Sequence, residues 1–181
     1  SIYPDSKLAI GPIIENGFYY DFHTEDSIST EDLPRIEEEM RKIIKEKSEI
    51  GKSFHNKKTA MDQFKKLSED YKVKIIQESG QAEGFQIYKN ENNEFIDLCR
   101  GPHLPNLSHI GAFKLTKVSG AYWKGDSSNE MLTRIYGTAW RNKKELDAYL
   151  AQLEEAEKRD HRRIGKDLDL FSIQEDAGGG L

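Results

Sequence analysis

The spacing of apolar and polar residues alternates between two patterns along the chain. Residues 7–14 and 18–22 are rich in apolar and aromatic side chains, and an Asn-Gly pair lies between the two runs. Asn-Gly is the short sequence most typical of a β-hairpin, because both residues accept a positive φ. We therefore expect two antiparallel strands here. Further strands are predicted over residues 53–56, 85–89, 94–99, 112–119 and 131–136.

Helical spacing, with an apolar residue every three or four positions, begins after residue 28. Ser29 or Thr30 is expected to cap a helix that runs to about residue 47, with Pro34 tolerated in its first turn. Residues 71–77 fit a helix and a strand equally well. A second helix over residues 59–68 is expected to bury its apolar side chains, Met61, Phe64 and Leu67.

The helical period returns over residues 142–166 and is too long for an ordinary core helix. An apolar stripe marks one face: Leu146, Tyr149, Leu150, Leu153 and Ala156. A basic run follows it, which is typical of a connector to another domain. The fold class predicted is therefore α+β, an antiparallel sheet with packed helices, followed by a long C-terminal linker helix.

Composition narrows the class of protein. The 181 residues are 36% hydrophobic and 33% charged, which indicates a folded chain, and no apolar run approaches the length of a membrane span. One cysteine excludes an internal disulfide framework and favours the cytoplasm. The start at Ser1 and the end at Leu181 lead us to expect a piece of a longer protein.

Reactive residue types are most concentrated around Cys99 and His103. The two residues are four positions apart, at the end of a predicted strand and on a Gly-Pro turn. The pair would suit two ligands of a zinc site, although even a catalytic site takes three from protein. It would equally suit a nucleophile with its base, or groups that polarise a water and a substrate carbonyl. A buried structural cysteine beside a turn histidine explains the same residues.

Lysines alternate with aromatic residues and glycines over residues 111–126. Lys114, Lys117 and Lys124 would suit a surface that holds phosphates and stacks bases. The alternative is a strand whose lysines face water. A net charge of −5 does not favour a freestanding nucleic-acid binder.

Five stretches together resemble threonyl-tRNA synthetases, in the order and spacing of that family. They are residues 7–21, 97–103, 121–126, 134–140 and 158–166. Related alanyl-tRNA editing proteins share the Cys-x-x-x-His element but are not expected to share the last two stretches.

The resemblance implies a class II synthetase editing domain (the second additional domain) over residues 1–140, a linker helix over 141–166 and the start of a catalytic domain over 167–181. Its activity would be hydrolysis of seryl-tRNA formed in error on threonine tRNA. Five residues match the family's site, with Lys72, Cys99 and His103 expected in catalysis and Tyr20 and Asp97 in substrate binding. Asp97 would hold the amino group or hydroxyl of serine, and Lys72 would act on the water or the charged transition state.

The resemblance also sets expectations for partners and cofactors. The expected partners are threonine tRNA and its serine moiety, with tRNA contacts at Lys114, Lys117 and Lys124. The family's His-x-x-x-His helix lies upstream of Ser1, so we expect the isolated chain to edit poorly. ATP, Mg²⁺ and Zn²⁺ are expected only in the catalytic domain, with no metal in this chain, and the parent is expected to dimerise through other domains. A rival hypothesis is a non-catalytic, tRNA-binding interdomain module.

Overall fold

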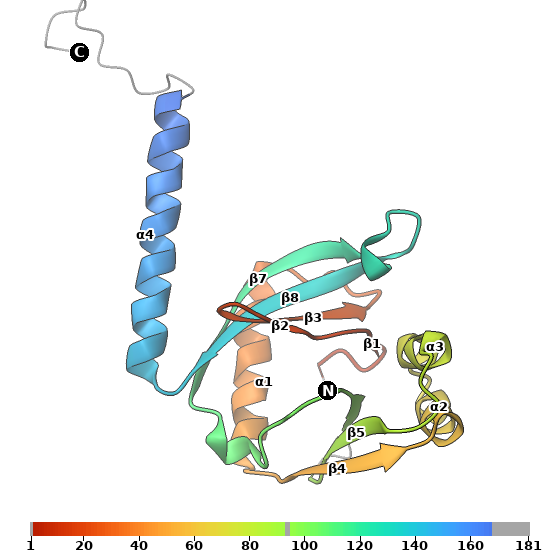
Figure 1. The fold of residues 1–181 in the computed structure, drawn as a ribbon. Helices are drawn as coiled ribbons and strands as arrows, with labels where there is room; N and C mark the ends of the chain where they lie inside the picture. Colours follow the sequence, from red (N-terminus) through yellow and green to blue (C-terminus); the bar gives the residue numbers. More distant parts are fainter. Residues whose placement is uncertain (1, 93–94, 168–181) are drawn as a thin grey trace, which may run out of the picture.

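Two antiparallel sheets and four α-helices make up residues 2–92 and 95–167, the part of the chain that the computed structural model describes (Figure 1). The larger sheet has the order β1-β3-β8-β7, with β2 paired to β3. Its strands are β1 (Lys7–Leu8), β2 (Ile13–Ile14), β3 (Gly17–His23), β7 (Ala112–Tyr122) and β8 (Met131–Trp140). The smaller sheet has the order β4-β5-β6, namely β4 (Ile50–His55), β5 (Phe85–Asn90) and β6 (Ile96–Leu98). The predicted α+β class is confirmed.

The helices are α1 (Leu33–Lys45), α2 (Lys57–Lys66), α3 (Asp70–Glu78) and α4 (Lys143–Asp167). α1 packs on β3, β7 and β8 of the large sheet, and α2 and α3 lie beside the small sheet (Figure 1). The ambiguous residues 71–77 are therefore helical. No helix in the described ranges has the length and apolar character to cross a bilayer.

The first hairpin forms where it was predicted, but its turn is different. Ile14 pairs with Gly17, so the loop consists of Glu15 and Asn16, and Gly17 already belongs to β3. Neither Asn16 nor Gly17 has a positive φ. Gly17 is required for another reason, because an added Cβ would overlap the carbonyl oxygen of Gly137 on the neighbouring strand. The expectation that the Asn-Gly pair forms the turn is wrong.

The first strand is also shorter than predicted. Residues 9–12 lie between β1 and β2 and are not in regular strand, although the Ala9 N–H still donates to Asp21 O at 2.9 Å and the Asp21 N–H to Ile10 O at 2.7 Å. Pro12 has no N–H to donate, so the regular ladder is interrupted there.

Ser29 is a capping residue as predicted, but of the short 3₁₀ turn that leads into α1, whereas the N-cap of α1 itself is Asp32, which makes no side-chain capping bond. Ser29 caps the 3₁₀ turn Thr30–Asp32, and Asp32 returns a hydrogen bond to the Ser29 N–H at 2.9 Å, forming a capping box. Pro34 lies in the first turn of α1, where no N–H partner is needed.

α2 buries Ala60 and Phe64, which pack with Ile76 of α3 and with Phe85 and Ile87 of β5. Met61 packs at the edge of this cluster. The prediction that Leu67 is buried is wrong, since the side chain is 50% exposed. The helix ends at Lys66, so Leu67 lies beyond its last helical residue, and the positive φ of Ser68 turns the chain after it.

α4 leaves the sheets as a long rod (Figure 1). Asn142 caps it by accepting a hydrogen bond from the Glu145 N–H at 3.0 Å. Leu146 is buried and Tyr149 packs on Trp140, with ring centroids 5.0 Å apart, but Leu153 further along the stripe is 37% exposed. Only the first turns of the apolar stripe are therefore covered. Beyond Asp167, the expected start of a catalytic domain lies outside the described residues.

Glu37 fastens α1 to the large sheet through a buried carboxylate. It is 2% exposed and accepts hydrogen bonds from the Leu115 N–H at 2.9 Å and from Arg41 Nη2 at 2.6 Å, with Lys114 Nζ 3.0 Å away. Burial alone would raise the pKa of Glu37, but the bonds from Lys114, Leu115 and Arg41 together hold it below its ordinary value of 4.5.

We expect Glu37→Ala to lower the free energy of unfolding by about 2–3 kcal/mol, because the buried Leu115 N–H loses its acceptor and two cations lose their partner. Glu39→Ala, on the exposed face of the same helix, is the control and should change it by less than about 0.5 kcal/mol. Urea unfolding monitored by circular dichroism measures both. Equal effects in the two variants would contradict this role of Glu37.

The hydrogen bonds to the Glu37 carboxylate also predict how the stability of the fold depends on pH. A carboxylate whose pKa is lowered by folding stabilises the folded state above its unfolded pKa, and this contribution is lost as pH falls through the folded value. Between pH 7 and pH 3 the native chain should therefore lose more stability than Glu37→Gln. The loss should begin near pH 4.5, the ordinary value.

Candidate functional site between the two sheets

Three polar side chains from three different elements meet between the sheets. The Tyr20 hydroxyl, from β3, donates to Asp97 Oδ2 of β6 at 2.6 Å. Lys72 of α3 donates from Nζ to the Tyr20 hydroxyl at 3.0 Å and forms an ion pair with Asp97 Oδ1 at 2.6 Å. The fold thus brings together three of the five residues predicted for catalysis and substrate binding. We call them the Tyr20–Asp97–Lys72 cluster.

Burial makes the contacts within the cluster strong. The Lys72 side chain is 3% exposed, whereas that of Asp97 is 19% exposed, so Asp97 is the charged group that faces outward. Burial and, next, the negative charge of Asp97 raise the pKa of Tyr20 far above its ordinary value of 10.0. Tyr20 therefore keeps its proton and acts as a hydrogen-bond donor to the carboxylate.

Side chains alternate between the two faces of β3, and this alternation directs Tyr20 towards Asp97 and Lys72. Phe18, Tyr20 and Phe22 share one face of the strand, and Phe18 and Phe22 pack in the core beneath α1. On the other face, Asp21 forms a two-point ion pair with Arg134 of β8, at 2.6 Å and 2.8 Å. Asp21 and Arg134 are opposite each other in the ladder, so this pair fixes the register of β3.

Gly11 leaves room for the Tyr20 ring. A Cβ added at Gly11 would overlap the ring carbons of Tyr20. The irregular segment between β1 and β2 therefore passes directly over Tyr20, and only a residue without a side chain allows both to keep their places.

Cys99 and His103 lie in the segment that follows β6. The Cys99 N–H donates to Gln86 O at 3.2 Å, and the Gly101 N–H points at Cys99 Sγ at 3.4 Å. The Gly101–Pro102 peptide bond is cis, and Gly101 has a φ of 63°, a conformation that suits glycine. The chain thereby turns back so that His103 packs on Tyr88, with ring centroids 4.2 Å apart.

His103 lies near the cluster, because its ring packs on Tyr88, the residue opposite Asp97 in the ladder, and Cys99 follows Asp97 by two residues. Asp97 opposes the effect of burial on His103, and burial prevails, so the pKa of His103 lies below its ordinary value of 6.5. His103 is nevertheless exposed to solvent. His103 is therefore mainly the neutral imidazole at pH 7, which can accept a proton. Cys99 contributes to the raised pKa of Tyr20.

Two residues of this region carry no signal in the sequence. Tyr88, 8% exposed, is opposite Asp97 in the ladder between β5 and β6 and supports the His103 ring. Glu69, at the start of α3, accepts the Leu8 N–H at 2.8 Å. Burial raises the pKa of Glu69, with Leu8, Lys7 and Lys72 acting against the increase. Only the packing of α3 on β1 reveals that Glu69 lies near the cluster.

Comparisons with known proteins match the chain to one family of sequences. A family model described as the threonyl and alanyl tRNA synthetase second additional domain matches residues 85–136, which include Asp97, Cys99 and His103. The chain is similar to threonine–tRNA ligases from Acidithiobacillus ferrooxidans (54% identical over 181 residues), Nitrosococcus oceani (52% over 181) and Prochlorococcus marinus (54% over 178). Over its whole length the chain is therefore similar to one segment of threonine–tRNA ligases. It spans 28% of the length of each of these relatives, and the matches cover 98% or more of the chain itself.

The structure gives other contacts to the three lysines predicted to bind tRNA. Lys114 is paired with buried Glu37, and Lys124 is paired with Glu78 of α3. Lys117 lies over the Tyr136 ring, with Nζ 5.9 Å from its centroid. Two of the three charges are therefore partly offset, and their role in binding tRNA stays a prediction.

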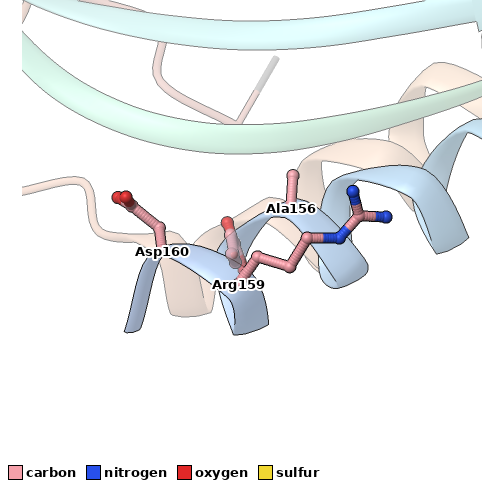
Figure 2. Close-up of a pocket in the computed structure, with 4 residues that line it drawn as sticks. Ala156, Arg159 and Asp160 are labelled. Atoms are coloured by element: carbon pink, nitrogen blue, oxygen red, sulfur yellow. The ribbon is translucent and has the colours of Figure 1, made fainter. Parts of the chain in front are cut away.

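Two further features of the described residues bear on where a ligand could bind. Among the described residues, no group of three or more His, Cys, Asp or Glu side chains is placed to hold a metal ion. An open hollow on one turn of α4 is lined by Ala156, Glu157, Arg159 and Asp160 (Figure 2). It contains none of the predicted site residues and, lying on a single helix, offers no enclosed cavity.

The contact between Gly11 and Tyr20 gives a test of the site geometry. Gly11→Ala should lower the free energy of unfolding by about 1–3 kcal/mol, because the new methyl group overlaps the Tyr20 ring. It should also shift the NMR signals of residues 97–99, since Tyr20 is bonded to Asp97. Gly80→Ala is the control: nothing lies within 4 Å of the added Cβ, and it should do neither. Unchanged signals in Gly11→Ala would contradict the geometry.

Proposed function

We propose that this region hydrolyses the ester bond of serine attached in error to threonine tRNA, as the editing part of a longer threonine–tRNA ligase. The observation that carries the proposal is the Tyr20–Asp97–Lys72 cluster, a buried and charged set of groups beside the segment of Cys99 and His103. The relatives, which are threonine–tRNA ligases, support it.

A ligase for threonine needs such a second site for a physical reason. Serine lacks one methyl group of threonine, and a single methyl or methylene group changes binding by only ~1–3 kcal/mol. A synthetic site that excludes larger amino acids therefore still admits serine. A hydrolytic pocket too small for the methyl group of threonine would remove the error and spare the correct product.

The residues of the site supply what ester hydrolysis needs. A water attacks the ester carbonyl and gives up a proton, for which neutral His103 is the candidate acceptor. The carbonyl oxygen becomes an oxyanion, which the Lys72 ammonium group is suited to stabilise. The proton then passes to the departing ribose oxygen, releasing serine and uncharged tRNA. Asp97, held by Tyr20, faces outward and is suited to the ammonium group of the seryl moiety.

The test compares hydrolysis of seryl-tRNA and threonyl-tRNA, by the 181-residue chain and by a threonine–tRNA ligase that contains it. The longer protein should cleave the seryl ester at least about 100-fold faster than the threonyl ester, because this is the selectivity that editing must add. Binding of both tRNAs without cleavage of either would leave the non-catalytic module, and such binding should weaken steeply with salt.

His103→Gln should lower the seryl-tRNA cleavage rate by about 100-fold or more, because the proton acceptor is lost. The native rate should fall with pH below the lowered pKa of His103 as the imidazole becomes protonated, and this acid limb should disappear in the variant. His109→Gln is the control, since His109 is exposed and bonds to Asn106. A variant that keeps both the native rate and the acid limb would exclude His103 as the base.

A further inference from the structure

In the structure, Lys72 is paired with the Asp97 carboxylate, the group proposed to bind a substrate's ammonium group. Asp97 Oδ1 accepts Lys72 Nζ at 2.6 Å and the Leu98 N–H at 2.7 Å, while Oδ2 accepts the Tyr20 hydroxyl at 2.6 Å. A carboxylate offers about four lone-pair positions. One position therefore remains, on Oδ2, and the outward exposure of Asp97 is how a ligand reaches it.

A second cation at this carboxylate would stand next to the first. Lys72 is almost fully buried, and like charges in a poorly solvated site repel each other far more strongly than in water. A ligand that carries a primary ammonium group can bind Asp97 tightly only when Lys72 gives up part of its own contact. The two cations thus compete for one anion.

Glu69 is a second carboxylate with which a displaced Lys72 ammonium group could pair. It is the N-cap residue of α3, and Lys72 is the third residue of the helix, so both belong to the first turn. Its carboxylate is half-buried and already interacts electrostatically with both Lys72 and Asp97. A small movement of Nζ from Asp97 towards Glu69 would keep the lysine charge paired.

We infer that Lys72 is an internal competitor for Asp97, and that binding of a substrate's free ammonium group releases its Nζ from that carboxylate, with Glu69 as the second partner. The inference rests on the proposed function and deepens it. The group suited to stabilise the oxyanion would become available only when an aminoacyl ester with a free amine has bound. Esters with a blocked amine would leave Lys72 held by Asp97.

The competition predicts an unusual effect of removing the lysine. Lys72→Met keeps the length of the side chain and removes its charge, so serinamide, which carries the ammonium group, hydroxyl and carbonyl of serine, should bind about 5–10-fold more tightly, the gain of an uncontested charge-assisted bond. The same variant should no longer cleave seryl-tRNA. A residue with a purely structural role would weaken binding and cleavage together.

Titration of the 181-residue chain by NMR measures the affinity for serinamide. Lys72→Arg retains the competing charge, so it should bind serinamide no more tightly than the native chain. The double variant Lys72→Met/Asp97→Asn should lose the tighter binding that Lys72→Met shows. The probe 3-hydroxypropanamide, which lacks the amine, should not distinguish Lys72→Met from the native chain. Unchanged or weaker binding of serinamide to folded Lys72→Met would overturn the inference, as would its failure to bind any variant.

A second measurement stands if Lys72→Met fails to fold. In the native chain, serinamide should shift the ¹⁵N signal of Lys72 Nζ, and 3-hydroxypropanamide should not. Equal shifts with both probes, or none with serinamide, would refute the competition.

These binding results separate the inference from the proposed function. If serinamide behaves as expected but the ligase containing the chain does not cleave seryl-tRNA, the competition stands and the editing proposal falls. If seryl-tRNA and N-acetylseryl-tRNA are cleaved equally fast, editing stands and the release of Lys72 by a free amine falls.

Discussion

The buried ion pair between Lys72 and Asp97 is the constraint on which the arrangement of this chain depends. Charges taken out of water are tolerated only when they are paired and hydrogen-bonded, and loss of one partner leaves the other at a high cost in free energy. Lys72 comes from α3, Asp97 from the small sheet, and Tyr20, which bonds to both, from the large sheet. The contact that holds these three parts together is therefore also the candidate site.

Two other buried carboxylates show by contrast why this cluster is suited to chemistry. Asp21 is 3% exposed at its side chain and its two oxygens are taken by Arg134, while Glu37 is 2% exposed and shared by Arg41, Lys114 and the Leu115 N–H. Both are closed to a ligand and fasten one element to another. Asp97 alone among the three is partly open to solvent, which lets a ligand use a carboxylate that the fold has already oriented.

The glycines near the site illustrate what local sequence can and cannot reveal. Gly17 looked like part of a turn because Asn-Gly favours a positive φ, yet it lies in β3 and serves the close approach of β8. Gly11 makes room for the Tyr20 ring, and Gly101 for the Tyr88 hydroxyl. Each of these requirements comes from a residue distant in the sequence, so no property of the neighbouring residues indicates it.

The sequence by itself predicted most of the elements and the likeness to threonyl-tRNA synthetases, but it left residues 71–77 open between helix and strand. The capping residues around α1, the periods of the strands and of α4, and five motifs in register are local properties of the chain, and they predicted the α+β class correctly. Lys72 and Asp97 were identified only through the resemblance to a known family, because a buried lysine and a solvated one look alike in a sequence. Tertiary structure decided that Lys72 is the buried basic residue in the part of the chain whose side chains are described, that Glu69 and Tyr88 adjoin the site, and that Leu67 faces solvent. Burial, ionisation and pairing depend on contacts across tens of residues, and those contacts exist only once the two sheets and α3 have packed together.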